Sequence, residues 1–408
     1  MELGFLCFEC GYVEREYIET ILIKNIEDIF ASFIGYIIFG YTLSGTNNSN
    51  NSIIGSLNNI ALYNVDISKY EIIFVNLCFA ATAATIVSGG VLERLRNSAY
   101  LLWILIIISI NYSFLSYWIW NENGWLYKLG FIDAAGCGPV HILGGCGALI
   151  PIIYLGPRYT TKINANGKLG SPEKPKNILL MCIGTFILWY GWIAFNVSSP
   201  VVAGTDINGN YGMIALFTCV SPIMSCGTLI IVSKIFPSYF VANGTSLMTA
   251  VLAGLVSITS SNYTVSFYAA IIIGIITPLF AFWSSNMLRY KLNIDEPLDV
   301  LPVHFTAGIV GLIMEGFLNK YNGLFYTGSF KHLGVQLLGV FVIVTFNIIT
   351  MGLYWKILFE KLLFRRIDVR MSPLQIFLAN NIAINDVEPR LREIIKCNSL
   401  FDKILLEK

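Results

Sequence analysis

The segment GPVHILGGCGALI, residues 138–150, places one histidine, His141, in a run that is otherwise almost wholly apolar. The segment LPVHFTAGIVGLI, residues 301–313, repeats this arrangement around His304. In both segments Pro-Val-His is followed by small residues at the third, fourth and seventh positions, and the whole chain contains only three histidines. The same lone imidazole in two matching settings indicates one site assembled from two parts of the chain.

The composition sets the class of protein. Of the 408 residues 55% are hydrophobic and only 12% are charged, and the mean hydropathy is +0.67. A soluble domain usually carries about 25% charged residues. A chain this apolar cannot hide its hydrophobic surface in one aqueous fold, so we predict an all-α polytopic protein of the lipid bilayer. The net charge of +1 gives no indication of a nucleic-acid partner.

Apolar runs long enough to cross a bilayer occur ten times. A hydrocarbon core of about 30 Å needs about 20 apolar residues in a helix. A shorter apolar stretch, at about residues 3–13, comes before these runs and is too short to span alone. The ten expected spans are residues 27–46, 71–92, 98–120, 132–155, 177–198, 211–234, 241–259, 265–287, 298–317 and 334–358.

The basic residues predict how these spans are oriented. Most Lys and Arg residues lie in 93–98, 156–176, 288–293 and 356–366, and these segments share one side if the ten spans alternate. Basic loops stay in the cytoplasm. We therefore expect a multi-pass protein of the plasma membrane with a cytoplasmic tail, residues 359–408.

The small residues after each histidine lie on the same helical face as the imidazole. Positions 0, 3, 4 and 7 of a helix share one face, and small residues let membrane helices approach closely. His141 lies on the fourth expected span and His304 on the ninth, so an odd number of spans separates them and the second unit is expected to be inverted. Inverted repeats place a site at the interface between the halves. We expect the imidazoles to meet there and share a proton or line a narrow path, the alternative being histidines that only satisfy packing. The small residues are Gly144, Gly145 and Ala148 after His141, and Ala307, Gly308 and Gly311 after His304.

Two acidic residues stand at span boundaries just before the histidines. Asp133 and Asp299 lie eight and five residues before His141 and His304, where a carboxylate can cap free helix N–H groups. We expect very few other charged groups to be buried.

Aromatic residues supply a possible site for a cation. Trp192, Phe195 and Ser199 share one helical face, and Phe79 and Trp120 add further rings. Aromatic faces attract cations by roughly 0.5–2 kcal/mol per contact, although aromatic residues also favour membrane interfaces.

Several segments resemble, in order and spacing, those of the ammonium transporters (the Amt/Mep/Rh family), over about residues 1–358. The resemblance implies eleven helices, with two inverted five-helix halves at about 1–155 and 177–317 and a final helix at 334–358, assembled as a homotrimer. The first helix is shortened relative to that family. The matching segments are MELGFLCFECGYVEREY, FAATAATIVSGGVLERLRNSAYL, DAAGCGPVHILGGCGAL, LWYGWIAFNVSS, AGLVSIT and LDVLPVHFTAGIVGLI.

The resemblance also implies roles for particular residues. His141 and His304 match the histidine pair that lines the pore. Trp120, Phe195 and Ser199 match positions that receive ammonium, and Phe79 and Phe195 match a gate below them. Asp133 matches an acidic residue that supports the outer site, and Trp192 and Asp299 are expected to support the site as well. Val75 stands where a further aromatic residue is expected.

These features together predict a protein that recruits ammonium or methylammonium, deprotonates it and conducts ammonia, with or without the proton. No cofactor or resident metal is expected, and the chain is not expected to be an enzyme. Three alternatives stay open: a neutral gas channel of Rh type, an ammonium sensor that signals through residues 365–408, and an intramembrane metalloenzyme that uses His141, His304 and Cys137.

Overall fold

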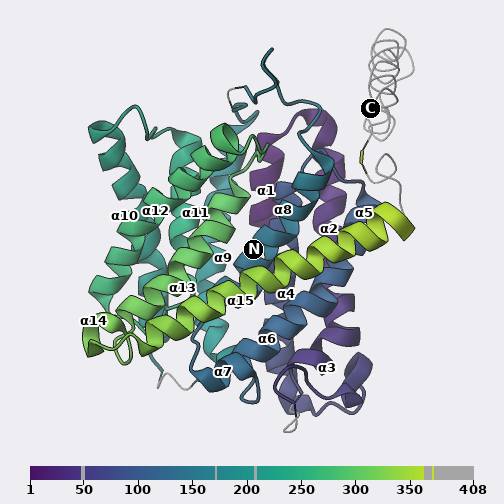
Figure 1. Cartoon of the computed structure of the whole chain (residues 1–408), viewed down its shortest axis with the longest axis vertical. Helices are drawn as coiled ribbons and strands as arrows, with labels where there is room; N and C mark the ends of the chain where they lie inside the picture. The colour runs from purple at the N-terminus through teal and green to yellow at the C-terminus, as the bar shows by residue number, and fades with distance from the viewer. Residues whose placement is uncertain (47–50, 171, 206–208, 363–369, 372–408) are drawn as a thin grey trace.

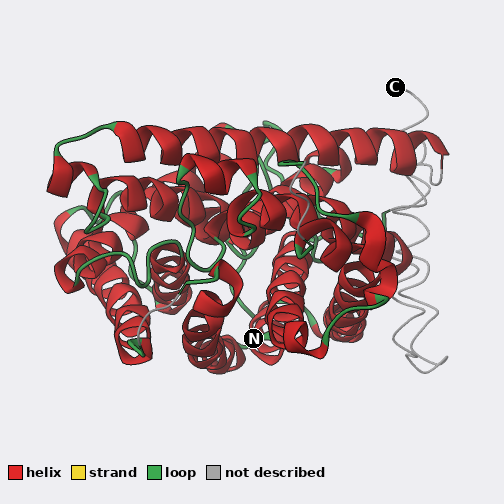
Figure 2. Cartoon of the chain, turned by 90° about the horizontal axis from the view of Figure 1, so that it is seen from below, coloured by secondary structure: helices red, strands yellow, loops and turns green. Residues whose placement is uncertain are grey.

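The computed structural model describes residues 1–46, 51–170, 172–205, 209–362 and 370–371, with side chains of 360–362 left aside, and its regular elements are all helices. Most of them run up and down in one bundle (Figure 1). The long helix α15 (Lys331–Tyr354) crosses the bundle diagonally and covers one of its sides (Figures 1 and 2). Most of the predicted tail, 359–408, lies outside the described residues.

The N-terminal half contains the helices that carry the first histidine. They are α1 (Glu2–Tyr12), η1 (Arg15–Tyr17), α2 (Ile18–Gly35), η2 (Tyr36–Gly40), α3 (Tyr41–Ser44), η3 (Leu57–Leu62), η4 (Ile67–Lys69), α4 (Tyr70–Gly90), α5 (Asn97–Ile107), η5 (Ile108–Tyr112), α6 (Ser113–Trp120), α7 (Trp125–Leu129), η6 (Cys137–Ile142) and α8 (Leu143–Leu155).

The C-terminal half carries the second histidine and ends in the diagonal helix. Its elements are α9 (Ile178–Ala203), α10 (Tyr211–Ile235), α11 (Gly244–Thr259), α12 (Phe267–Asn286), η7 (Met287–Lys291), η8 (Leu301–Thr306), α13 (Ala307–Leu318), α14 (Leu324–Thr327), α15 and η9 (Trp355–Leu362).

Eight helices in the described part of the chain are long and apolar enough to cross a membrane. α11 is a shorter apolar helix at the seventh expected span. The first expected span, 27–46, begins later than the helix there, which starts at Ile18, includes Lys24 and is not one of these eight helices. A search for apolar runs stops before Lys24, whereas the folded helix buries this side chain together with that of Asp28. The chain is a multi-pass integral membrane protein.

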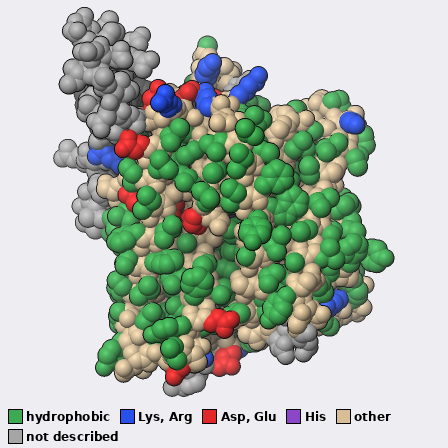
Figure 3. Space-filling model, turned by 180° about the vertical axis from the view of Figure 1, so that it is seen from behind, with side chains coloured by type: hydrophobic (Ala, Val, Ile, Leu, Met, Phe, Trp, Pro, Cys, Tyr) green, Lys and Arg blue, Asp and Glu red, His purple; other side chains and the backbone are tan. Residues whose placement is uncertain are grey.

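The surface of the bundle matches a membrane setting. In Figure 3 hydrophobic side chains cover most of the face, and the charged side chains gather mainly at the upper and lower ends. Large apolar side chains that are more than half exposed include those of Phe186, Tyr190, Ile231, Trp283 and Phe341. Since water would penalise such a surface, these side chains are suited to contact lipid.

Buried ion pairs tie together the loops at the upper end in Figure 1, here called the Arg158 end. Arg158 Nε lies 3.0 Å from Asp295 Oδ2, its Nη2 donates to Oδ1 at 3.2 Å, and Arg94 Nη2 lies 3.7 Å from Oδ2. Burial alone would raise the pKa of Asp295, but the two guanidinium groups outweigh it and hold this pKa well below its usual value. Met371 N–H donates to the Arg94 carbonyl at 2.7 Å, so this part of the tail lies at the same end.

The two halves also meet through their first helices. α1 packs along α9 at glycines: a Cβ on Gly4 would lie 2.7 Å from Leu188 Cγ, and one on Gly11 would lie 2.7 Å from the Met181 backbone nitrogen. Such close approach is typical of small residues between membrane helices. The chain starts at mid-height of the bundle (Figure 1), on the side away from α15 (Figure 2).

Candidate transport site

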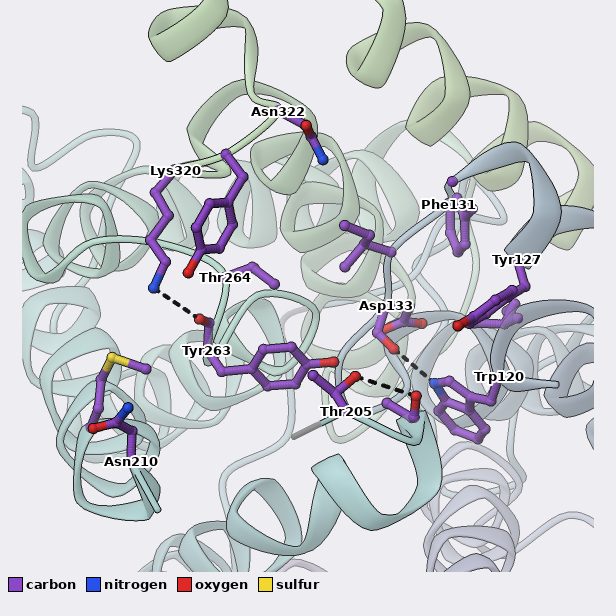
Figure 4. Close-up of a pocket in the computed structure, with 16 residues that line it drawn as sticks. Trp120, Tyr127, Phe131, Asp133, Thr205, Asn210, Tyr263, Thr264, Lys320 and Asn322 are labelled. Carbon is purple, nitrogen blue, oxygen red and sulfur yellow. Dashed lines mark hydrogen bonds between the residues drawn. The ribbon is translucent and has the colours of Figure 1, made fainter. Parts of the chain in front are cut away.

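A cavity of about 560 Å³ opens at the lower end of the bundle, here called the Asp133 end. Figure 4 shows Trp120, Asp133, Tyr263 and Lys320 around it. Trp120 Nε1 donates to the Asp133 carbonyl at 2.8 Å, and Lys320 Nζ donates to the Tyr263 carbonyl at 3.4 Å. Polar groups and rings thus line a hollow wide enough for a hydrated small solute.

The side chain of Asp133 caps the helix that carries His141. Its Oδ1 accepts from the N–H groups of Gly136 (3.0 Å) and Cys137 (2.9 Å), and its Oδ2 accepts from Gly138 N–H at 2.7 Å. A carboxylate at this position satisfies N–H groups that lack helical partners. Asp133 therefore fixes where η6 begins, in agreement with the predicted cap.

Asp299 is bound differently from the predicted cap. Its Oδ1 accepts from the hydroxyl of Ser285 on α12 at 2.6 Å, and its backbone has a positive φ of 56°. The helix after it begins through the Asp299 carbonyl, which accepts from Val303 N–H at 2.8 Å. The prediction that its carboxylate caps the helix is wrong, because the left-handed backbone turns the side chain toward α12.

Two stacked phenylalanines lie between the Asp133 end and the histidines. The ring centroids of Phe79 and Phe195 are 4.0 Å apart with an interplanar angle of 24°, and Trp120 lies 5.8 Å from Phe79. Stacked rings at this distance leave no free passage between them. A second cavity, of about 440 Å³, touches both rings and is lined by Val75 and Glu2 as well.

Ser199 lies beside these rings and not in the 560 Å³ cavity. It is fully buried, and its hydroxyl donates to the Asn196 carbonyl at 2.8 Å and lies 3.4 Å from Asn262 Nδ2. The structure therefore brings Trp120, Phe79 and Phe195 together, while the Ser199 hydroxyl is held by its own helix.

Beyond the phenylalanines the two imidazoles meet. Nδ1 of His141 and Nδ1 of His304 are 3.2 Å apart, and the ring centroids are 5.3 Å apart at an angle of 23°. Trp192 stacks on His141 with centroids 5.2 Å apart, and its Nε1 donates to Thr259 Oγ1 at 3.0 Å. Phe195 lies 6.1 Å from His141. Phenylalanines, tryptophan and imidazoles thus form one continuous row.

The local sequence explains why the histidines approach so closely. Pro139 and Pro302 each lie two residues before a histidine, and both segments form wide π-helical turns, η6 and η8, because proline lacks the N–H of a regular helix. One glycine of each predicted small face packs against the opposite half, Gly145 on Phe305 and Gly308 on η6, whereas Gly144 packs on α4 and Gly311 on α11. A Cβ on Gly308 would lie 3.2 Å from the Cys137 carbonyl and 3.5 Å from the Cβ of His141.

The expectation that few other charged groups are buried is wrong. Glu9, Lys24, Asp28 and Glu315 are each at most 1% exposed. In the sequence, Lys24 and Asp28 are spaced four apart and so share one face of a helix, which was the available signal for a buried polar helix face. Glu9 had no such signal, because its partners come from α2 and α4.

The row of rings restricts what can pass. The idealised cost of moving an ammonium-sized ion from water into a medium of low dielectric constant is of order 20 kcal/mol. Contacts with phenylalanines and a stacked tryptophan offset only a small part of this desolvation free energy. The geometry therefore favours a small neutral solute that can hydrogen-bond to imidazole nitrogens.

Comparison with known proteins identifies the family of the chain. The sequence matches the Ammonium Transporter Family over residues 1–371. The chain belongs to this family of transporters. As an ammonium transporter family member it is 30% identical over 354 residues to Ammonium transporter 3 of Dictyostelium discoideum, covering 83% of this chain and 79% of that protein.

Solved structures share the fold of this family member. A protein titled Sensor Amt Protein matches with a TM-score of 0.83 and 29% identity, over 94% of each chain. Mep2 of Candida albicans matches with a TM-score of 0.75 and 25% identity, over 87% of this chain and 80% of that one. The family is one of transporters and not of enzymes.

Proposed function

We propose that this protein receives ammonium at the Asp133 end, removes its proton and conducts ammonia along His141 and His304. The observation that carries this proposal is the 3.2 Å contact between the two Nδ1 atoms, which lies beyond the Phe79–Phe195 stack as seen from the Asp133 end. An ion stays in the wide cavity because the dry row excludes it. Neutral ammonia is small, and imidazole nitrogens can replace the hydrogen bonds that it loses on leaving water.

The contact between the imidazoles supports a proton path. In a neutral pair one Nδ1 must carry the hydrogen and the other must accept it, so the Nε2 atoms at the two ends are one acceptor and one donor. A proton taken up at the accepting Nε2 can be released from the other ring after transfer across the Nδ1–Nδ1 bond. His141 Nε2 is buried and has no hydrogen-bond partner in the described part of the chain, as a site for a passing solute requires.

Trp120 and Phe195 are the rings that we assign to recruitment, together with Ser199, and Phe79 and Phe195 form the gate. The face of Trp120 attracts a cation from the 560 Å³ cavity. Asp133, Trp192 and Asp299 hold the site in place through the contacts described above. Because the Ser199 hydroxyl hydrogen is donated to Asn196, only its oxygen is available to an ammonium ion.

The remaining expectations are part of the same proposal. Residues 1–358 form the transport domain with eleven helices in two inverted halves, and 359–408 form a cytoplasmic tail. The Arg158 end faces the cytoplasm of a cell whose plasma membrane holds the protein, because basic loops are retained there. Three copies assemble as a homotrimer, which native mass spectrometry of the purified protein would test.

An ammonium sensor is the second candidate. The likeness to the protein titled Sensor Amt Protein, which covers 94% of each chain, favours it. In that case ammonium binds at the same site and the tail transmits the signal. Deletion of residues 372–408 leaves flux intact in a transporter, while in a sensor it abolishes the response to ammonium.

The proposal is tested in proteoliposomes by recording uptake and current for ammonium, methylammonium and potassium. We expect saturable ammonium flux, and its loss by about 100-fold in His141→Ala and His304→Ala. His332→Gln removes the third histidine, which lies away from the row, and should retain flux. Wild-type-like flux in both alanine variants would refute the relay, and flux without current would identify a neutral gas channel.

A further inference from the structure

A small cavity lies beyond His304, toward the Arg158 end. Its volume is about 20 Å³, and apolar side chains such as Phe5, Leu252 and Val303 form most of its wall. The polar residues that line it are Glu9, Thr85 and His304. A space of this size holds about one water-sized molecule when polar partners are present, and ammonia has the size of water.

Glu9 presents a carboxylate oxygen that is not satisfied by the protein. The residue is 1% exposed, and its Oε2 accepts from Asn25 Nδ2 at 3.1 Å and from Ser88 Oγ at 3.0 Å. Its Oε1 is buried and has no hydrogen-bond partner in the described part of the chain. Leaving a buried carboxylate oxygen unpaired is costly. We therefore expect a small molecule in the cavity to form a hydrogen bond with this oxygen.

The backbone around Glu9 keeps room for that partner. Gly89 lies opposite Oε1: a Cβ at this position would lie 3.5 Å from Oε1 and 3.0 Å from Val300 Cγ2. The glycine therefore leaves open the space that a methyl group would fill. Lys24 lies on α2 beside Asn25, with its Nζ directed to the Val91 carbonyl at 3.4 Å, and so does not occupy this space.

His304 lines the same cavity and has one ring nitrogen that does not contact His141. Its Nδ1 is used in the contact with His141, so Nε2 is the atom left for a ligand. The hydroxyl of Thr85 has one hydrogen, and both Glu2 and the Ala81 carbonyl accept from it. The cavity is thus bounded by an imidazole on one side and a carboxyl group on the other.

We propose that Glu9 is a further proton-exchanging residue of the pore, which acts on the ammonia that reaches the cavity beyond His304. This proposal rests on the transport function proposed above. The carboxylic acid gives its proton to ammonia: the Oε1–H bond breaks, an N–H bond forms on the ammonia lone pair, and carboxylate and ammonium result. The histidine pair supplies the next proton to Oε1, and the reverse sequence returns a proton from ammonium to Glu9.

Other ionisable groups act on Glu9 from the elements packed around it. They are Glu2 on its own helix, Lys24 and Asp28 on α2, Tyr100 on α5 and His304 on η8. The ammonium group of Lys24 favours the ionised form of Glu9. The carboxyl groups of Glu2 and Asp28, when ionised, oppose a negative charge on Glu9. Asp28 accepts from the Tyr100 hydroxyl and does not line the cavity, which makes it the matched control.

Glu9→Gln removes the exchangeable proton and keeps the shape of the side chain. In proteoliposomes we expect ammonium flux to fall by about tenfold or more and its dependence on pH, over roughly pH 5 to 8, to flatten. Glu9→Asp should restore part of the flux together with the pH dependence. Asp28→Asn, compared at equal amounts of folded protein, should keep flux that depends on pH, displaced along the pH axis only by the loss of the Asp28 carboxyl group.

Gly89→Ala provides a second test that leaves all charges unchanged. Its methyl group should lower flux and leave the shape of the pH profile as in the wild type. Equal losses and equal profiles in Glu9→Gln and Asp28→Asn would show a structural role for Glu9 and overturn the proposal. Wild-type flux and pH dependence in Glu9→Gln would also overturn it, while the histidine variants test the transport function separately.

Discussion

Gly145 and Phe305 lie in direct contact, one on each histidine-bearing segment, and leave no room for a further atom between them. A Cβ at Gly145 would lie 2.7 Å from the Cβ of Phe305 and 3.2 Å from its backbone nitrogen. Real Cβ atoms essentially never approach another atom so closely. This contact therefore sets the spacing of η8 from α8, and with it the spacing of the imidazoles.

Gly145→Ala is expected to separate His141 from His304 and to lower ammonium flux, because the added methyl group must push Phe305 away. The cost in stability should be about 1–3 kcal/mol, the usual range for overpacking a well-packed interior. Flux in proteoliposomes and thermal unfolding in detergent measure the two effects. Gly334→Ala, on α15 with nothing within 4 Å of the new Cβ, is the control and should change neither.

Removing one ring of the gate should change selectivity more than folding. In Phe195→Ala the Phe79–Phe195 stack is lost, so we expect methylammonium flux to rise relative to ammonium flux, measured as competing uptake in one vesicle preparation. Phe217→Ala removes a ring of similar burial from the packing between α10 and α12, and should leave this ratio as it is. A ratio unchanged in Phe195→Ala would contradict the assignment of the gate.

Loss of the Asp133 carboxylate should destabilise the start of η6. Asp133→Ala leaves three buried N–H groups, those of Gly136, Cys137 and Gly138, without their acceptor. We expect a loss of about 1–3 kcal/mol, seen as a lower midpoint of thermal unfolding. Asp66→Ala is the control, because Asp66 caps the exposed η4 turn through Ser68, and a shift as large as that of Asp133→Ala would show that the burial of the cap is irrelevant.

The ion pairs of Asp295 should make the free energy of unfolding depend on pH. Its pKa is lowered in the folded protein, since Arg158 and Arg94 outweigh the effect of burial. The group therefore contributes fully above its unfolded pKa of about 3.9, and the contribution is lost as pH falls through the lower folded pKa.

Asp295→Asn should remove this acid-dependent part and lower stability at neutral pH by roughly 3–5 kcal/mol, because it leaves two buried guanidinium groups underpaired. Unfolding midpoints measured at a series of pH values for wild type and variant would test both statements. Parallel curves down to acid pH would show that the ion pairs contribute nothing to the dependence on pH.

The sequence by itself determined the class of protein and the place of most spans, because the cost of exposing apolar side chains and unpaired backbone groups depends on local composition. It also singled out His141 and His304, since matching segments are visible without a structure. The start of helix α2 at Ile18 was missed for the same reason, because Lys24 looks unfavourable in an apolar run until its partner is known.

Only the tertiary structure decided which atoms meet. The 3.2 Å distance between the two Nδ1 atoms depends on glycine contacts between segments 163 residues apart, and the positive φ of Asp299 turns its carboxylate to α12. Glu9 lines a small cavity together with His304 because α1 packs between α2, α4 and α9. Such relationships depend on how helices pack in three dimensions, and periodicity along a chain carries no information about them.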